Sequence, residues 1–201
     1  LDNALGGIIA GNGAAAVTST GAASVTNSGL IDAATLGIDL TGGGLVTNGV
    51  HGTITGTSDG VRIAGAAGTV SNAGSIGGGS YAVLLGSGFA NRVVVTAGAV
   101  FTGTVSGGNI VTPGAAVVST LELASAQSGG TLHGLGVQFV DFGGITIDAG
   151  AAWTLSGTNT VLAGGSVANS GTLTISGSLT NAGSIGSDIT PNIQYNGRIE
   201  E

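Results

Sequence analysis

The sequence of 201 residues contains no cysteine, no methionine and no lysine. The absence of cysteine excludes a disulfide framework and any thiolate metal site. Three arginines, Arg62, Arg92 and Arg198, are expected to stand alone against ten acidic residues, and the net charge of −7 argues against a nucleic-acid partner. No run of eighteen apolar residues is present. The chain is therefore not predicted to span a membrane with a helix.

Large side chains are also scarce, because only 3% of the residues are aromatic and 6% are charged. A conventional globular core relies on large side chains packed at high density, and this composition does not supply them. Glycine contributes 42 residues. Disorder is not predicted either, because β-branched apolar residues recur throughout and the mean hydropathy is +0.52. The composition favours short strands joined by tight turns.

Internal repetition is the strongest signal in the sequence. A phrase of the form apolar, any, Asn, any, Gly, any, apolar recurs, and its spacing gives a period of 21 to 24 residues. Each period holds about three short apolar alternations separated by Gly, Asn or Ser, which predicts three strands. The Asn is expected to adopt a left-handed turn conformation and to bond its neighbours in a ladder. The copies begin at Val25, Val46, Val70, Val94, Val167 and Leu179, and Thr96 takes the Asn position in the fourth.

These features predict an all-β fold, a right-handed parallel β-helix (β-solenoid) of about 21–24 residues per coil with three short strands per coil. Roughly nine coils would stack into a rod of roughly 40 Å. Residues 1–187 are expected to form one solenoid domain within a longer chain. Residues 188–201 are expected to be a linker, the start of another segment or an artificial end. The larger aromatics between Phe89 and Trp153 are expected to mark a wider or better-packed section.

Two stretches imitate catalytic or cofactor motifs. The first, Gly56–Gly60, has the spacing of a serine nucleophile elbow, with His51 and His133 as imaginable bases. An elbow needs a following helix, whereas a strand phrase follows Gly60, so a plain turn is the better interpretation. The second, Gly11–Gly13 with Asp32, imitates a dinucleotide fingerprint but lacks the βαβ context. We expect no catalytic residue, no cofactor and no metal.

The acidic residues are dispersed singly, and both histidines are predicted to lie on the surface. A solvated outer face is the expected place for the five inner aspartates, and a weak calcium site is the minor alternative. Glu122 should point outward, and an approach of Asp39 to Asp59 stays open. Two Thr pairs, Thr53 with Thr55 and Thr172 with Thr174, are too few for an ice-binding array. The five aspartates are Asp32, Asp39, Asp59, Asp141 and Asp148.

The repeat phrases resemble those of the passenger domains of bacterial autotransporters, the type V secreted proteins, over roughly residues 20 to 186. The resemblance rests on Val25–Gly29, Leu179–Gly183 and the stretch from Leu132 to Trp153. It implies a right-handed β-helix that is exported and displayed outside the cell with the help of a C-terminal translocation domain. Leu1–Gly7 lacks the basic and apolar regions of a signal peptide, so an exported chain would be in its mature form.

The resulting expectation is a non-enzymatic structural or adhesive stalk on the bacterial surface or in the medium. Its partner would be a host or bacterial surface ligand, or other copies of itself in aggregates or fibres. No binding residue is nominated. The alternative is a carbohydrate-active β-helix enzyme, a polysaccharide lyase or hydrolase, which would need a long insertion bearing two or three acids beside an Arg or Lys. No such insertion is visible between Gly37 and Gly103.

Overall fold

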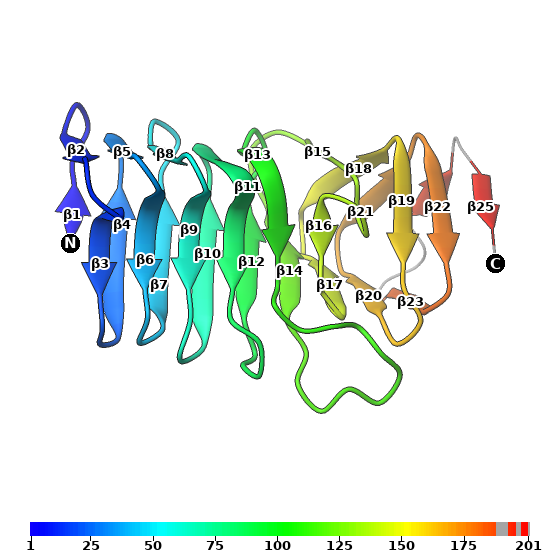
Figure 1. Cartoon of the computed structure of the whole chain (residues 1–201). Helices are drawn as coiled ribbons and strands as arrows, with labels where there is room; N and C mark the ends of the chain where they lie inside the picture. The colour runs from blue at the N-terminus through cyan, green and yellow to red at the C-terminus, as the bar shows by residue number, and fades with distance from the viewer. Residues whose placement is uncertain (188–192, 196–197, 201) are drawn as a thin grey trace.

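The structure, a computed structural model, describes residues 1–187, 193–195 and 198–200, with side chains described for residues 1–186. All of its described elements are β-strands, and the described residues contain no helix. Parallel sheets form a β-solenoid of about eight turns with about 22 residues per coil. The coils stack along one axis from the N-terminus to the C-terminus (Figure 1). The predicted right-handed parallel β-helix is confirmed, with about one turn fewer than expected.

One sheet, which we call sheet A, runs along the whole described solenoid and supplies the first strand of every coil. We number the coils by these strands. Val25 pairs with Val46 and Val46 with Val70, in parallel register. Equivalent residues therefore form columns along the axis, as expected when coils stack strand on strand. The strands, in spatial order, are β1 (Asp2–Asn3), β4 (Ala23–Asn27), β7 (Gly44–Asn48), β10 (Gly68–Asn72), β12 (Arg92–Val95), β14 (Thr120–Leu123), β17 (Gly144–Ile147), β20 (Ser166–Asn169) and β23 (Ser184–Ser187).

The second and third faces of the solenoid are joined as sheet B over the first five coils, because two long strands each run around a corner. These are β11 (Ser75–Leu85) and β13 (Val100–Ser106). The other strands of sheet B are β2 (Ile8–Gly11), β3 (Ala15–Ser19), β5 (Leu30–Ala33), β6 (Leu36–Leu40), β8 (Thr53–Gly56), β9 (Asp59–Ile63) and β16 (Phe139–Val140).

Farther along, sheet C forms the second face from the sixth coil and sheet D forms the third face from the seventh coil, after β16 has ended sheet B. Sheet C contains β15 (Gly130–His133), β18 (Ala152–Ser156), β21 (Thr172–Ile175) and β24 (Ile193–Tyr195). Sheet D contains β19 (Thr158–Val161), β22 (Ser178–Asn181) and β25 (Arg198–Glu200). β24 and β25 lie within the segment expected to be a linker or an end, of which residues 188–192, 196–197 and 201 lie outside the described residues.

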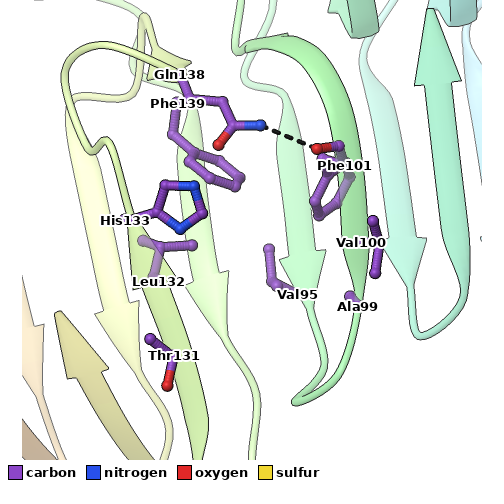
Figure 2. Close-up of a pocket in the computed structure, with 9 residues that line it drawn as sticks. All are labelled: Val95, Ala99, Val100, Phe101, Thr131, Leu132, His133, Gln138 and Phe139. Atoms are coloured by element: carbon purple, nitrogen blue, oxygen red, sulfur yellow. Dashed lines mark hydrogen bonds between the residues drawn. The ribbon is translucent and has the colours of Figure 1, made fainter. Parts of the chain in front are cut away.

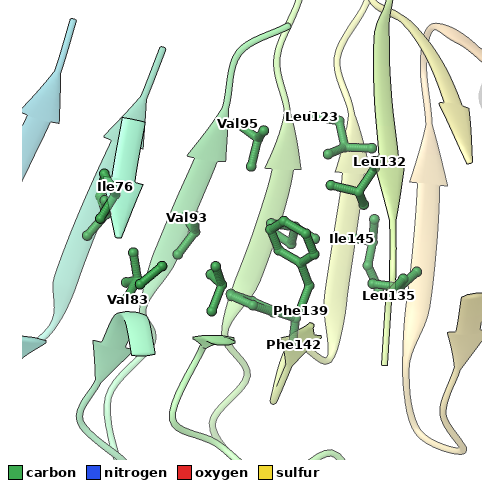
Figure 3. Close-up of a cluster of buried hydrophobic side chains, with 14 of the residues drawn as sticks. Ile76, Val83, Val93, Val95, Leu123, Leu132, Leu135, Phe139, Phe142 and Ile145 are labelled. Atoms are coloured by element: carbon green, nitrogen blue, oxygen red, sulfur yellow. The ribbon is translucent and has the colours of Figure 1, made fainter. Parts of the chain in front are cut away.

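The core is a narrow column of aliphatic side chains, because successive residues of a strand point to opposite faces. Val61 and Ile63 are buried and flank the outward Arg62, and Ile38 and Leu40 flank Asp39 in the same way. Figure 3 shows where this column changes in character. Aliphatics such as Ile76 and Val83 give way to the larger Phe139 and Phe142 in the middle coils.

An asparagine ladder lines the corner after sheet A in the first four coils. The side-chain Nδ2 of Asn27 donates to Oδ1 of Asn48 at 2.8 Å, and Nδ2 of Asn48 donates to Oδ1 of Asn72 at 2.9 Å. Asn3 donates to Asn27 in the same way, and all four amides are buried. The predicted ladder is therefore present in these coils. Each amide points into the solenoid and satisfies its neighbour, which burial requires.

Two details of the repeat prediction were wrong. In the fifth coil Val95, not Thr96, lies in register with Asn72, because Val70 pairs with Val93 rather than with Val94. A polar residue there would have lacked an amide in the next coil, where Leu123 takes the same position. The ladder asparagines also do not adopt a left-handed conformation, and Asp141 is the one described non-glycine residue with positive φ. In two of them, Asn27 and Asn72, Oδ1 instead accepts a hydrogen bond from the N–H of the Gly two residues later, at 3.3 and 3.1 Å.

The fifth coil, from β12 to the start of β14, is longer than its neighbours. Val93 pairs with Leu121, 28 positions later, whereas Val70 and Val93 are 23 apart. The extra length lies in the connection of residues 107–119, which the structure places between β13 and β14 (Figure 1). Phe101 and Phe139 meet edge to face in this section, with ring centroids 5.6 Å apart. The aromatic residues predicted a wider or better-packed section, and this ring contact lies within the stretch from Phe89 to Trp153.

Candidate functional site

Two charged clusters lie on the outside of the solenoid, contrary to the expectation that the arginines stand alone. In the first, Arg62 forms a bidentate ion pair with Asp39, with Nε to Oδ1 at 2.9 Å and Nη2 to Oδ2 at 2.6 Å. The two residues are in register on adjacent coils, so stacking itself brings them together. The hydrogen bonds to Asp39, and the charge of nearby Asp59, raise the pKa of Arg62. Asp39 and Asp59 thus act on one guanidinium.

The second cluster spans three consecutive coils of sheet A. Arg92 donates from both Nε and Nη2 to a single oxygen of Glu122, Oε2, with the Nε distance 2.7 Å. Glu122 points outward, as predicted. Asp148 follows β17 in the next coil, and its pKa is raised by burial and by the charge of Glu122. Two carboxylates and one guanidinium therefore share one face, which the dispersed sequence positions did not predict.

The imitation of a nucleophile elbow is a corner between strands. Gly56 ends β8, Asp59 begins β9, and Thr57 with Ser58 forms the bend between them. No helix follows, so the strained turn that exposes a nucleophile is not built. The hydroxyl of Ser58 donates to Asp59 Oδ1 at 3.2 Å, and both histidines are exposed.

The imitation of a dinucleotide fingerprint also falls on a corner, between β2 and β3 of the first coil. The residue proposed as the ribose acid, Asp32, pairs with Ala10 across the two coils and accepts a hydrogen bond from Thr55 Oγ1. A strand rather than a helix follows Gly13, so no helix N-terminus is available to a pyrophosphate. The interpretation of both stretches as turns agrees with the structure.

The remaining aspartates are held by single partners. Asp141 accepts a hydrogen bond from Ser106 Oγ at 2.7 Å. Asp59 is buried rather than solvated as expected, because Leu36 and Tyr81 lie in register on either side of it. In the described part of the chain, no three His or acidic side chains converge as metal ligands. The Thr pair of β8 stacks on Leu30 and Asp32, so no threonine array forms on this face.

The most distinctive site is a slot in the wall between the fifth and sixth coils. β13 pairs with β16 only through Val105 and Ser106, and β15 pairs with β18 alone. The segments Val100–Gly103 and Gly130–His133 therefore have no ladder between them. A pocket of about 190 Å³ opens at this slot. It is lined by Val95, Ala99, Val100, Phe101, Thr131, Leu132, His133, Gln138 and Phe139 (Figure 2).

The side chain of Gln138 bridges this slot. Its Nε2 donates to the backbone oxygens of Phe101 at 3.0 Å and Gly103 at 3.2 Å, and the bond to Phe101 is drawn in Figure 2. Phe101 points inward but stays partly exposed, whereas Ile76, which pairs with it in the preceding coil, is fully buried. The core is therefore accessible from outside at this slot.

A second break lies on the third face, between β16 and β19. A pocket of about 210 Å³ opens there beside Phe142, Asp141 and Thr160. The connection of residues 107–119 lies near this side of the molecule, and Gly164 closely approaches Thr112 and Pro113. The connection contains no charged residue. It is thus an insertion without the acids and base that the carbohydrate-active alternative requires.

Sequence reasoning missed Gln138 and the slot. One signal was available, because the repeat phrases are missing between Val100 and Ile145, where the period lengthens. The strands of a lengthened coil cannot pair with those of the adjacent coil on every face, so unpaired strand edges are expected somewhere within it. The face on which they occur, and the side chain that covers them, depend on the stacking of coils, which the spacing alone does not define.

The chain was compared with protein families, curated proteins and solved structures. No protein-family model, no curated protein and no solved structure matches the chain. Among the described residues, no helix is long and apolar enough to cross a membrane.

Proposed function

We propose that the chain is a non-enzymatic stalk, a structural or adhesive β-solenoid of the autotransporter-passenger kind that is displayed on a bacterial surface or secreted. The single observation that carries the proposal is the unbroken nine-stranded sheet A, in which each coil is bonded to the next along the whole described length. Such a quasi-one-dimensional stack suits a role in which length and an extended outer surface matter.

The surface chemistry supports the same role. Both arginines whose side chains the structure describes are ion-paired, so neither guanidinium is left without an acidic partner on the outer faces. Columns of hydroxyls run along the axis, for example Thr131, Thr154 and Thr174 on sheet C. An uncharged column of hydroxyls such as this one can lie against another surface without burying unpaired charge.

Localisation is the first test. Antibody raised against the chain is applied to intact and to permeabilised source cells, and intact cells are also treated with protease before immunoblotting. We expect labelling of intact cells or detection in the medium, and loss of the cell-associated signal after protease. Labelling that requires permeabilisation would overturn the proposal.

Adhesion is tested with beads that carry the purified chain at matched density. An apolar edge at the first and third coils, with Leu5 and Val50 exposed by 71% and 69%, is the first region to vary. We expect bead clustering or binding to bacterial or host cells to fall in the Leu5→Ser, Val50→Ser variant. Val137→Ser, which changes a side chain also 69% exposed but in the sixth coil, is the control.

A polysaccharide-active enzyme is the second candidate, favoured by the cluster of Arg92, Glu122 and Asp148. A carboxyl with a raised pKa near a second carboxyl is the arrangement of a general acid with its partner in glycoside cleavage. The test is release of reducing ends or unsaturated products from acidic and neutral polysaccharides. The enzyme candidate requires activity that Glu122→Gln and Asp148→Asn abolish and that Asp32→Asn leaves intact.

A further inference from the structure

The slot between β13 and β15 places two unpaired strand edges opposite each other. Both strands run in the same direction, as in the rest of the parallel solenoid. An edge strand presents alternate N–H and C=O groups that bond readily to another extended chain, and folded proteins usually cover such edges. Here the edges of Val100–Gly103 and Gly130–His133 flank an open pocket.

The bonds of Gln138 show where the hydrogen-bond acceptors of one edge point. Phe101 and Gly103 are two residues apart, so their carbonyl groups lie on the same side of the strand. Both carbonyl oxygens accept a hydrogen bond from Nε2 of Gln138, at 3.0 and 3.2 Å. In a complete coil the backbone N–H groups of a neighbouring strand would occupy these positions. The amide therefore substitutes for a strand, and it is a side chain that can move away.

The floor of the slot is apolar. Phe101 is partly exposed, whereas Ile31, Ile54 and Ile76, which precede it in the same inward column, are fully buried. Phe139 packs against its ring edge to face. A cavity of about 190 Å³ exceeds the roughly 150 Å³ that accommodates a benzene molecule, so one large apolar side chain fits.

We propose that this slot binds an extended peptide segment of another protein by β-augmentation between β13 and β15. One apolar or aromatic side chain of the peptide enters above Phe101, and the residues on either side of it face outward beside Thr131 and His133. The peptide backbone replaces Gln138 at the carbonyls of Phe101 and Gly103. No acidic or basic residue other than His133 lines the slot, so the segment is uncharged. The inference stands on the slot geometry and does not depend on the stalk role.

The probe is the fluorescein-labelled peptide Gly-Thr-Phe-Thr-Gly-Thr, patterned on the second-face strand at residues 52–57 with Phe in place of Ile54. Its control is the same peptide N-methylated at the two Thr that flank Phe, which keeps the side chains and removes donors to one edge. Binding to the full chain is measured by fluorescence anisotropy. The unmodified peptide is expected to bind at least tenfold more tightly than the control, because two or more backbone hydrogen bonds at about 1 kcal/mol each are lost.

The variant Gln138→Ala tests whether the Gln138 amide occupies the place of a neighbouring strand. Removal of a competing amide is expected to tighten peptide binding by about fivefold, since one net hydrogen bond corresponds to about 1 kcal/mol. If Gln138 has only a structural role, the variant will have a lower thermal midpoint and an unchanged or weaker affinity for the peptide. That result would overturn the proposal. Gln127→Ala, which changes an exposed residue outside the slot, is the matched control.

Hydrogen exchange locates the peptide without any variant. The amides of Val100–Gly103 and Gly130–His133 are expected to gain protection on peptide addition, while those of the already paired β7 and β10 stay unchanged. Equal binding of the methylated peptide would indicate a pocket for a side chain alone and would contradict the proposal. Protection of the same amides by rising protein concentration without peptide would assign the slot to a second copy of this chain, which also contradicts it.

Discussion

The asparagine ladder gives the sharpest test of how the coils are held together. Asn48 is 1% exposed, accepts from Asn27, and donates to Asn72 Oδ1, to Gly52 O at 3.0 Å and to Ser75 O at 3.1 Å. Asn48→Ala removes the accepted hydrogen bond and those donated by two N–H groups, which the three oxygens share, so about three bonds worth about 1 kcal/mol each are lost. Asn27 keeps its bonds to the carbonyls of Gly29 and Thr53, which reduces the loss. We expect the free energy of unfolding to fall by about 2–3 kcal/mol.

The assay is equilibrium urea unfolding followed by circular dichroism. Thr47→Ala, which changes an outward neighbour in the same strand, is the control and is expected to stay within about 0.5 kcal/mol. The double variant Asn27→Ala, Asn48→Ala should lose less than the sum of the two single variants, because the bond they share is counted twice in that sum. A loss below about 1 kcal/mol for Asn48→Ala would refute the reasoning, since it would mean that the buried amides contribute no more than surface groups.

Three further predictions concern other contacts. The coupling energy between Arg62 and Asp39, measured by a double-mutant cycle, is expected to stay below about 1 kcal/mol and to shrink in high salt. The reason is that the Arg62 side chain is 40% exposed. A coupling energy that does not change with salt would contradict this prediction. Since the folded state raises the pKa of Asp148, stability is lost as pH rises from the ordinary aspartate value through the folded one. Asp148→Asn should therefore gain stability over the wild type at about pH 7 and lose that gain near pH 3, and a gain independent of pH would be evidence against it. Trp153, the single Trp, is 3% exposed and donates from Nε1 to Ala124 O at 3.0 Å. Its fluorescence emission should shift to the red on unfolding, and Trp153→Phe should lower the free energy of unfolding by about 1 kcal/mol. An unchanged urea midpoint for this variant would argue against a stabilising hydrogen bond.

The fold was largely predictable because the repeat determines it. Residues such as Val46 and Val70 recur at nearly constant spacing, and a strand of period two with a Gly turn every few residues has few other ways to bury its apolar face. The phrase beginning at Val94 was misaligned by one residue because three consecutive valines, Val93 to Val95, offer no internal marker of direction. Only pairing with Val70 on the preceding coil shows which of them points inward.

The candidate sites were less predictable because each depends on contacts between coils. Arg62 and Asp39 are 23 positions apart, and Arg92 and Glu122 are 30 apart. The first separation is one ordinary coil and could have been inferred from the period. The second separation spans the lengthened fifth coil, and the repeat does not show where its extra residues lie. For the same reason the partner of Gln138, 37 positions earlier, could not be inferred from spacing.

The breaks in the second and third faces also affect the mechanics of the rod. Between the fifth and seventh coils only sheet A continues through the solenoid wall without interruption. A load across the rod therefore meets continuous hydrogen bonding on one side and open seams on the other two. We therefore expect the rod to bend most easily with sheet A as the hinge. Such bending would widen or narrow the slot. A shear force on the rod would thus be converted into a change of aperture at this one level, far from either end of the solenoid.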